Sequence, residues 1–468
     1  MRLGLAVLVL LLLLSGAARA QGAPAPLAVP GAVRDIALSG EAVVVASTPK
    51  GPAGRTLLVE RRVPGSPPTV LLRTRLEDDD DHVSVAASAE AAAVSLAADD
   101  GAARVLIGPA AGPLREVARC ETALLPLTIA VDGPRILWGE GGCGVPPRRP
   151  RESGPAAFAE GAVDPTAPVS RVALEESTLA GPIATGAGRT VAGILRPTFF
   201  GLVRSEVREL ARDGTGAVLA REPSGFLAPV GVLPDGSPLL VGQSFEDLDG
   251  ERDERCVSRV VVVPPAGGER RRVPLGGCPE PDFSEEDTLP GRLVAVAGDR
   301  VIAITHDEQR RRGPARAALV STAPSGADRR ILSRGSYRSP LGLDAEGPRV
   351  AWWQPRCAGG AEIVTGAAVP AARTARGLAA CRAELLTRRP RLRGRRIVVR
   401  LRCPQGCKGR VVDETSCLNQ RSRTFAFGRG THRVSLGLSA RTRRRGRLRL
   451  AVRVENGPSD ARVVRLRR

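Results

Sequence analysis

A short sequence pattern recurs along most of this chain and restricts the folds that are open to it. Each copy is an apolar run, a tight turn and a second apolar run, as in "LTIAVDGPRILWGE" (127–140) and "LGLDAEGPRVAWWQ" (341–354). Asp-Gly and similar pairs suit the turn of a β-hairpin, because glycine tolerates the positive φ angles that such turns need. The pattern therefore predicts a series of short antiparallel hairpins.

The turns of these hairpins follow one another at nearly regular intervals. They lie at Gly40, Ala89, Gly133, Gly188, Gly236, Gly298 and Gly347, with successive spacings of 49, 44, 55, 48, 62 and 49 residues. A period near 50 residues that holds four short strands is typical of a β-propeller blade, rather than of a sandwich or a solenoid. The chain is therefore expected to be all-β with a seven-bladed propeller, although an irregular unit at 181–222 leaves six or eight blades open.

The four strands of the first blade can be traced directly, as "DIALS", "AVVVAS", "TLLVERRV" and "TVLLRTR". The two longest intervals are expected to contain insertions. Residues 141–168 are rich in Pro and Gly and should form no strand pair, and 244–256 and 279–290 are expected to be acidic loops.

The N-terminus has the three parts of a secretory signal peptide. Arg2 supplies a positive charge, residues 3–14 supply an apolar run, and a small-residue cleavage site ends at Ala20. An uncleaved membrane anchor is the alternative, but the apolar run is short for a span of about 20 residues. We expect residues 1–20 to be removed and the mature chain, with no transmembrane segment, to be secreted or held in the cell envelope.

Export changes the expected role of the nine cysteines. In an oxidising compartment cysteines form disulfides more often than they bind metals or act as nucleophiles. The disulfide candidates are three widely spaced pairs and one close trio: Cys120 with Cys143, Cys256 with Cys278, Cys357 with Cys381, and Cys403, Cys407 and Cys417. Pairing within the trio is left open and leaves one thiol over. A zinc site formed by the trio and His432 is the alternative, although its spacing fits no standard zinc finger.

The last fifth of the chain carries all of its net positive charge. Residues 376–468 hold 27 basic and 5 acidic residues, a net of +22 in a chain whose total is +20. Five segments there alternate apolar and polar or basic residues, which places Val, Ile and Leu on one face of a strand and Arg on the other. They are "RRIVVRLRC", "RSRTFAF", "HRVSLGLS", "RLRLAVRVE" and "DARVVRLR". The expected organisation is a signal peptide at 1–20, a propeller at 21–375 and a small Arg-rich antiparallel β-sandwich at 376–468.

This basic segment has two interpretations. Uncompensated positive charge attracts polyanions such as cell-wall phosphate polymers, acidic polysaccharides or nucleic acid. Alternating Arg also keeps exposed strands soluble, and this chain uses Arg almost throughout, with Lys50 and Lys408 as its only lysines. Specific nucleic-acid binding is not expected, because the segment offers only Phe425 and Phe427 for stacking on bases.

The repeat resembles the blades of secreted bacterial propellers of the TolB-like or WD40-like kind, in which a strand ends in Asp-Gly and an apolar strand follows. The resemblance covers about residues 28–375 and implies the fold and a binding role, with the ligand left open. "CPQGCKGRV" (403–411) is similar to a C-P-x-x-C-x-G stretch in accessory β-domains of exported actinobacterial proteins, which implies no activity.

Signals for catalysis and for cofactors are few. No G-x-S-x-G elbow, H-E-x-x-H pair or glycine-rich phosphate loop occurs, and the only histidines are His82, His306 and His432. One acidic stretch, "FEDLDGERDERC" (245–256), is a candidate calcium loop with oxygen ligands from Asp247, Asp249, Glu251 and Asp253. It lacks the Gly and bidentate acid positions of an EF-hand, so a solvated loop paired with neighbouring Arg is the alternative. No other cofactor is expected.

Two functions fit these features. The first is an exported non-catalytic binding or scaffold protein, in which the propeller binds an unidentified protein or envelope ligand and the basic domain associates with anionic envelope material. The second is an extracellular glycan hydrolase or lyase, with carboxylates from different blades and an aromatic residue in one pocket at the propeller axis. We expect the first, because with three Trp and one Tyr the chain has few aromatic platforms for a sugar.

Overall fold

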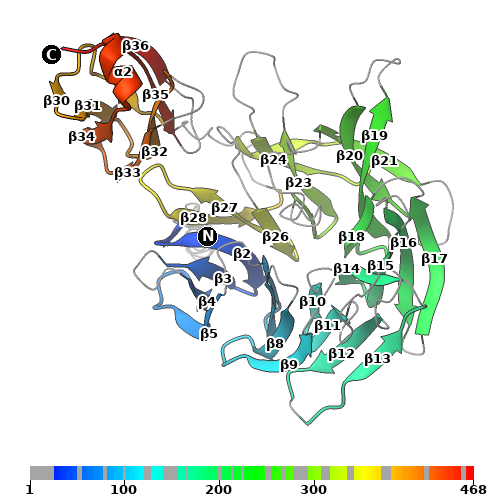
Figure 1. Cartoon of the computed structure of the whole chain (residues 1–468). Helices are drawn as coiled ribbons and strands as arrows, with labels where there is room; N and C mark the ends of the chain where they lie inside the picture. Colours follow the sequence, from blue (N-terminus) through cyan, green and yellow to red (C-terminus); the bar gives the residue numbers. More distant parts are fainter. Residues whose placement is uncertain are drawn as a thin grey trace, which may run out of the picture.

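The computed structural model describes most of the chain between Pro26 and Arg467 (Figure 1). The described residues are 26–49, 55–76, 82–98, 102–120, 128–140, 156–164, 166–175, 178–197, 203–211, 214–222, 226–247, 254–265, 270–277, 293–306, 317–334, 342–369, 381–415, 421–454 and 460–467. Within them the protein is almost entirely β-structure, as expected, with one short helix. The predicted signal peptide and the predicted domain boundary at 375 and 376 lie outside the described residues.

Between residues 27 and 367, seven four-stranded antiparallel sheets are arranged around a central axis, as in a β-propeller (Figure 1). Blades 1 to 3 are β2 (Ala32–Ser39), β3 (Ala42–Thr48), β4 (Thr56–Arg62) and β5 (Thr69–Arg75); β6 (His82–Ala87), β7 (Ala91–Ala97), β8 (Ala103–Pro109) and β9 (Arg115–Cys120); and β10 (Ile129–Asp132), β11 (Arg135–Glu140), β12 (Ala157–Ala162) and β13 (Ser170–Ala173). The four strands of blade 1 agree with the four that were traced from the sequence.

Blades 4 to 6 keep the same strand order. They are β14 (Leu179–Gly186), β15 (Arg189–Pro197), β16 (Val203–Ala211) and β17 (Gly214–Glu222); β18 (Phe226–Val232), β19 (Pro238–Asp247), β20 (Glu254–Val262) and β21 (Arg271–Gly277); and β22 (Val294–Ala297), β23 (Arg300–His306), β24 (Ala317–Thr322) and β25 (Arg330–Arg334). The irregular unit at 181–222 is thus an ordinary blade, the fourth.

Each predicted hairpin turn joins the first and second strands of a blade. The six turn glycines have positive φ angles between 53° and 82°, which a residue with a Cβ atom rarely adopts. The turn without glycine, at Ala89, is held in another way, because Ser88 Oγ accepts the backbone N–H groups of Glu90 and Ala91. All seven turns were therefore predicted correctly.

Two of the expected insertions contain strands, so these predictions were wrong in part. β12 lies within 141–168 and is the third strand of blade 3. The small residues of β12 leave room for a neighbouring side chain and do not mark a loop. A Cβ atom on Gly161, for example, would lie 3.1 Å from the ring of the fully buried Trp138. Similarly, 244–247 and 254–256 extend β19 and β20, which remain paired as far as Asp247 and Glu254. Residues 279–290 lie outside the described residues.

Blade 7 closes the ring with a strand from the N-terminal side of the propeller. It consists of β26 (Gly342–Glu346), β27 (Arg349–Pro355), β28 (Ala361–Ala367) and β1 (Leu27–Val29). β1 pairs antiparallel with β28, with Leu27 opposite Ile363. Val29 is 1% exposed and packs in a cluster that spans blades 7 and 1. The first and last parts of the propeller sequence are thereby joined in one sheet.

Residues 381–467 form a second unit, the C-terminal unit, with two four-stranded sheets and a hydrophobic core of its own (Figure 1). One sheet holds β29 (Glu384–Leu385), β30 (Leu392–Arg393), β31 (Arg396–Cys403) and β34 (Gly430–Gly437); the other holds β32 (Cys407–Asp413), β33 (Ser422–Phe427), β35 (Arg447–Val454) and β36 (Asp460–Arg465). Both sheets bury side chains in the same cluster, for example Ile397 from the first and Leu450 from the second. All five predicted strand segments are strands.

The helix of the C-terminal unit, α2 (Ala440–Arg445), was not predicted from the sequence. Ser439 caps its first turn by accepting the N–H of Thr442, and Gly446 ends it with a φ of 66°. Ser before and Gly after a helix are recognised end signals, so the sequence did contain the information.

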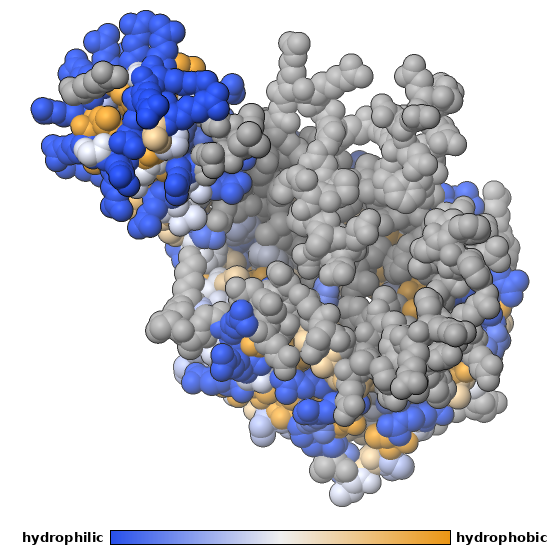
Figure 2. All heavy atoms as spheres, in the orientation of Figure 1, coloured by the Kyte–Doolittle hydropathy of each residue, from blue (hydrophilic) through white to orange (hydrophobic). Residues whose placement is uncertain are grey.

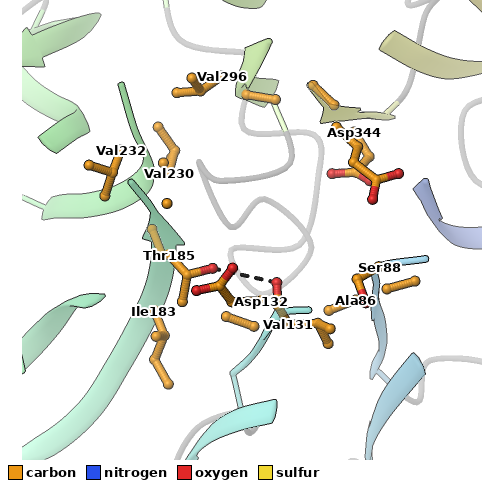
Figure 3. Close-up of a pocket in the computed structure, with 18 of the residues that line it drawn as sticks. Ala86, Ser88, Val131, Asp132, Ile183, Thr185, Val230, Val232, Val296 and Asp344 are labelled. Carbon is orange, nitrogen blue, oxygen red and sulfur yellow. Dashed lines mark hydrogen bonds between the residues drawn. The ribbon is translucent and has the colours of Figure 1, made fainter. Parts of the chain in front are cut away.

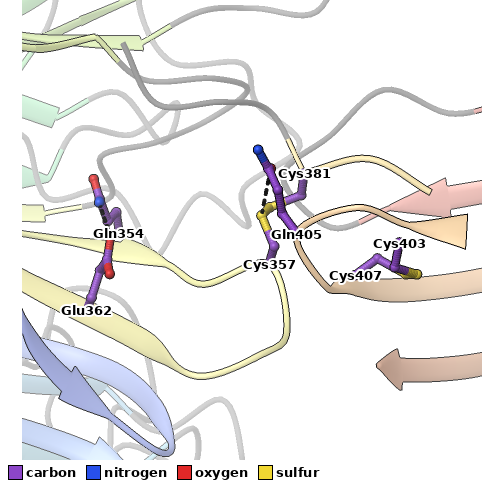
Figure 4. Close-up of a disulfide and its surroundings, with 7 residues drawn as sticks. All are labelled: Gln354, Cys357, Glu362, Cys381, Cys403, Gln405 and Cys407. Atoms are coloured by element: carbon purple, nitrogen blue, oxygen red, sulfur yellow. Dashed lines mark hydrogen bonds between the residues drawn. A yellow bond between two sulfur atoms is a disulfide. The ribbon is translucent and has the colours of Figure 1, made fainter. Parts of the chain in front are cut away.

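A disulfide fastens the C-terminal unit to blade 7 (Figure 4). Cys357, in the turn between β27 and β28, is bonded to Cys381, as predicted, and packs on the core of the C-terminal unit. In the same contact, Gly406 lies so close to Ala358 that a Cβ atom on it would be 2.9 Å from the alanine Cβ. The disulfide therefore joins two packed surfaces rather than two loose ends.

Replacing both cysteines, Cys357→Ser with Cys381→Ser, is expected to loosen this contact and to lower the melting temperature by several degrees, since a native disulfide contributes about 2–4 kcal/mol. Small-angle X-ray scattering should show a larger radius of gyration as the C-terminal unit separates from blade 7. The control is Cys403→Ser with Cys407→Ser, whose disulfide lies within the C-terminal unit. An unchanged scattering profile in the first variant would show that packing alone holds the two parts together.

Candidate functional site

The first strands of the seven blades line a cavity of 760 Å³ on the propeller axis (Figure 3). These strands are β2, β6, β10, β14, β18, β22 and β26. Each is the inner edge of its sheet, so half of its backbone N–H and C=O groups have no partner within the blade. Most of the lining is small or apolar, and its charged residues are Asp35, Asp132, Asp344 and Glu346.

Three of these carboxylates bind backbone N–H groups of the neighbouring blade. Asp344 Oδ2 accepts the N–H of Leu38 at 2.6 Å, and Glu346 Oε2 accepts that of Gly40 at 2.6 Å, both across the junction between blades 7 and 1. Asp35 Oδ2 accepts the N–H of Val85 at 2.8 Å, between blades 1 and 2. The carboxylates thus satisfy inner-edge donors and connect adjacent blades.

Hydroxyl groups make the same kind of contact to carbonyl groups. Ser39 Oγ donates to the carbonyl of Ser88 at 2.6 Å, and Ser88 Oγ to that of Gly133 at 2.7 Å. Further round the ring, Thr128 Oγ1 donates to Gly181 at 2.7 Å, and Thr185 Oγ1 lies 3.5 Å from the carbonyl of Val131 (Figure 3). The polar residues of blades 1 to 4 therefore have a structural role in joining the inner strands.

Asp344 has the most perturbed acidity in the cavity. Removal from bulk water raises its pKa from 3.8 to about 7, the nearby charges of Asp35 and Glu346 act in the same direction, and the N–H groups of Leu38 and Ala345 oppose them. Its accessible surface faces the cavity. A carboxyl group with a pKa near neutrality can hold or release a proton, which is the property that a general acid needs.

The cavity has only part of what a propeller glycosidase would need. It brings carboxylates together, but none of the lining residues that the structure describes is aromatic. Trp138 is fully buried and Trp352 is 8% exposed, and both pack in clusters between blades. The sugar platform expected for an enzyme is therefore absent from the described part of the cavity.

The predicted calcium loop is not tested by the structure. Asp247 is the last residue of β19, whereas Asp249, Glu251 and Asp253 lie outside the described residues. Elsewhere in the described part of the chain, no group of three or more His, Cys, Asp or Glu side chains is placed to hold a metal ion.

The remaining cysteines are placed as follows. Cys403 is bonded to Cys407, which removes two of the four ligands of the alternative zinc site. Its proposed fourth ligand, His432, instead stacks on Phe427 with ring centroids 4.4 Å apart, and its Nε2 is 2.9 Å from the carbonyl of Gly428. Cys120 is disulfide-bonded, and Cys256 lies in β20. Cys143, Cys278 and Cys417 lie outside the described residues, so the pairs that involve them stay predictions.

The C-terminal unit presents the second candidate site, a basic surface on both of its sheets. In β31, exposed Arg396, Arg400 and Arg402 alternate with fully buried apolar residues, and β35 shows a similar pattern with Arg447, Arg449 and Arg453. Figure 2 shows this unit as a hydrophilic lobe beside the propeller. The sequence pattern predicted these faces correctly except at Val398 and Val463, two valines that are exposed.

No protein-family model matches the sequence, and no curated protein matches it. Solved structures resemble it distantly. The β-propeller domain of the Trilobed protease from Pyrococcus furiosus, described as having an open velcro topology, is 11% identical over 74% of this chain and 97% of that chain, with a TM-score of 0.45. A puromycin-hydrolyzing peptidase from Mycobacterium tuberculosis is 16% identical over 80% of this chain and 59% of its own, with a TM-score of 0.45.

TolB from Acinetobacter baumannii is also similar in fold, at 16% identity over 58% of each chain and a TM-score of 0.34. At these low identities and TM-scores the likenesses support no conclusion about this chain. Its β-propeller is seen in the arrangement of the seven four-stranded sheets themselves.

Proposed function

We propose that this protein is an exported, non-catalytic binding protein. Its propeller serves as an interaction platform, and its C-terminal unit, in our interpretation a small β-sandwich, associates with anionic polymers of the cell envelope. The observation that carries the proposal is the exposed Arg on both sheets of the C-terminal unit, within a segment whose net charge is +22. Such a surface attracts polyanions over a distance of about a Debye length, roughly 10 Å.

Few of these charges are neutralised within the unit. Among its described residues, Glu414 pairs with Arg449 and Arg453, Asp460 pairs with Arg462, and Glu384 lies 3.9 Å from Arg402. The positive field of the unit is therefore largely available to an external partner.

Export is supported by the cysteines and by the position of the first strand. Disulfides such as Cys357–Cys381 and Cys403–Cys407 persist in oxidising compartments. β1 begins at Leu27, so cleavage after Ala20 would leave the ring-closing strand intact. Among the described residues, no helix has the length and apolar character needed to cross a bilayer.

The test is salt-dependent binding of the full chain to purified anionic cell-wall polymer, with a neutral polysaccharide for comparison. Arg396, Arg410, Arg433 and Arg465, all exposed, are replaced by Gln in one variant. We expect this variant to lose at least roughly tenfold in affinity, because each lost phosphate contact weakens binding and its salt dependence. The charge-matched control replaces exposed Arg73, Arg75, Arg271 and Arg272 of the propeller and should bind normally. Equal losses in the two variants, or no binding by the unmodified chain above low salt, would contradict the proposal.

A glycan hydrolase or lyase is the second candidate, favoured by one observation: Asp344, with its pKa of about 7, lies beside Asp35 and Glu346. The test is incubation of the full chain with acidic and neutral glycans, compared with Asp344→Asn. Cleavage that disappears in the variant would support this candidate and displace the first one.

A further inference from the structure

Arginines lie directly opposite one another on neighbouring strands of the C-terminal unit. Four such pairs occur among its described residues: Arg393 with Arg396, Arg400 with Arg433, Arg410 with Arg453, and Arg447 with Arg465. All eight side chains are exposed. Directly opposed residues share a face with Cβ atoms about 4.5–5.5 Å apart, and like charges in this position destabilise the sheet. Exposed arginines would keep the strands soluble without lying directly opposite one another, so solubility alone does not explain the four pairs.

The two sheets differ in how far these charges are compensated. On the sheet that contains β35, Glu414 lies 3.3 Å from Arg449 Nε and 2.8 Å from Arg453 Nη2. On the outer face formed by β31 and β34, the contact between Arg402 and Glu384 is long, at 3.9 Å. Arg396, Arg400 and Arg433 have no acidic partner among the described residues. This surface, named here the β31–β34 face, consists of exposed Arg396, Arg400, Arg402, Thr431, Arg433 and Ser435, with one exposed apolar residue, Val398, between Arg396 and Arg400.

The spacing along this face favours a polymer over a single anion. A strand rises about 3.3 Å per residue, so the Cα atoms of Arg396 and Arg402 are about 20 Å apart, which is too far for one small anion to bridge. A linear polymer with repeated negative charges reaches the arginines in succession, and each contact after the first is effectively intramolecular.

The opposed pair Arg400 and Arg433 favours phosphate over carboxylate. A guanidinium group presents a planar fork of donors that a single planar carboxylate can fill. A phosphate group is tetrahedral, so its oxygens point in different directions and can accept from two guanidinium groups at once. Thr431 and Ser435 place further hydroxyl donors on the same face.

We propose that the β31–β34 face is a binding track for an extended phosphate-bearing polymer, which would lie along β31 and place phosphates at Arg396, at the pair Arg400 and Arg433, and at Arg402. The proposal rests on the proposed function and adds to it the face, the residues and the charged group that is recognised.

The test uses the full chain carrying Arg400→Gln and Arg433→Gln. The matched control, Arg441→Gln with Arg444→Gln, removes the same charge from exposed positions of α2 in the same unit. Probes are long-chain inorganic polyphosphate, inorganic phosphate, and polygalacturonate as a carboxylate polymer. The track variant should bind polyphosphate at least roughly tenfold more weakly, and the slope of log affinity against log salt should fall by about 0.7, because the pair holds one phosphate. The control should keep both values, and inorganic phosphate should bind far more weakly than polyphosphate.

The outcomes separate this proposal from the one it rests on. Equal losses in the track and control variants would overturn the track but leave a polyanion-binding unit. Equal affinity for polygalacturonate would overturn the preference for phosphate. If the unmodified chain binds none of the polymers above low salt, the proposed function fails as well. Melting curves check folding, and the track variant should melt at the same or a higher temperature at low salt, because the substitutions remove a repulsive pair.

Discussion

A chain that carries Val29→Asp is expected to lose roughly 3–5 kcal/mol in free energy of unfolding, because the change buries an unpaired charge in the strand that closes the propeller. Val29 is 1% exposed and packs with Val33, Ile36 and Ile363 in the cluster shared by blades 7 and 1. The side chains of this cluster are apolar, so the new carboxylate would either pull β1 off β28 or take up a proton at the expense of folding.

The matched control is Ala28→Asp, one residue earlier in the same strand. Ala28 is exposed, and its backbone carbonyl accepts the guanidinium of Arg62 at 3.0 Å. A carboxylate there stays in water, so the expected change is within about 0.5 kcal/mol. Urea unfolding of both variants, with limited proteolysis to detect an open ring, gives the comparison. A similar small effect of the two substitutions would show that β1 contributes little to closure.

The closing strand also marks a limit of what the sequence could predict. The hairpin turns could be predicted from local sequence. A turn such as Asp132-Gly133 needs a positive φ, and the glycine in the sequence indicates it. β1 is three residues long, and its partner strand lies more than 300 positions away, so neither periodicity nor turn chemistry could reveal the pairing. The pairing of Cys403 with Cys407 was left open for a different reason, because three nearby cysteines allow more than one connectivity.

The role of the cavity carboxylates could not be predicted from the sequence. Asp344 and Glu346 are two residues apart in one strand, so period-two alternation places them on the same side. Which neighbouring chain segment they meet depends on the ring, because their donors Leu38 and Gly40 are each 306 positions away. The sequence therefore predicted the hairpin turn next to these residues. The contacts that they make with the neighbouring blade could be seen only in the folded ring.

Asp344→Asn is expected to make the protein more stable at pH 8 and to leave its stability nearly unchanged at pH 4. The pKa of Asp344 is about 7 in the folded chain against an ordinary 3.8. Between about pH 4 and pH 7 the folded state thus holds a proton that the unfolded state has released, so stability falls as the pH rises through this window. Full ionisation at pH 8 costs at most about 4 kcal/mol, from about 1.4 kcal/mol per pKa unit. Asparagine stays neutral, and its amide oxygen can still accept the N–H of Leu38.

Urea unfolding of the unmodified chain and of Asp344→Asn at several pH values gives the difference between them, in which the titration of other groups cancels. This difference should be small near pH 4, should grow between pH 5 and 7, and should level off near pH 8. The control is Asp132→Asn, which removes a cavity carboxylate whose side chain is 40% exposed and lies 3.8 Å from Arg135. Equal growth of the difference in this control would show that the effect does not come from the burial of Asp344. A difference for Asp344→Asn that is independent of pH would mean that this carboxylate is already ionised in the folded ring, and that its contact with Leu38 outweighs the cost of removing it from water.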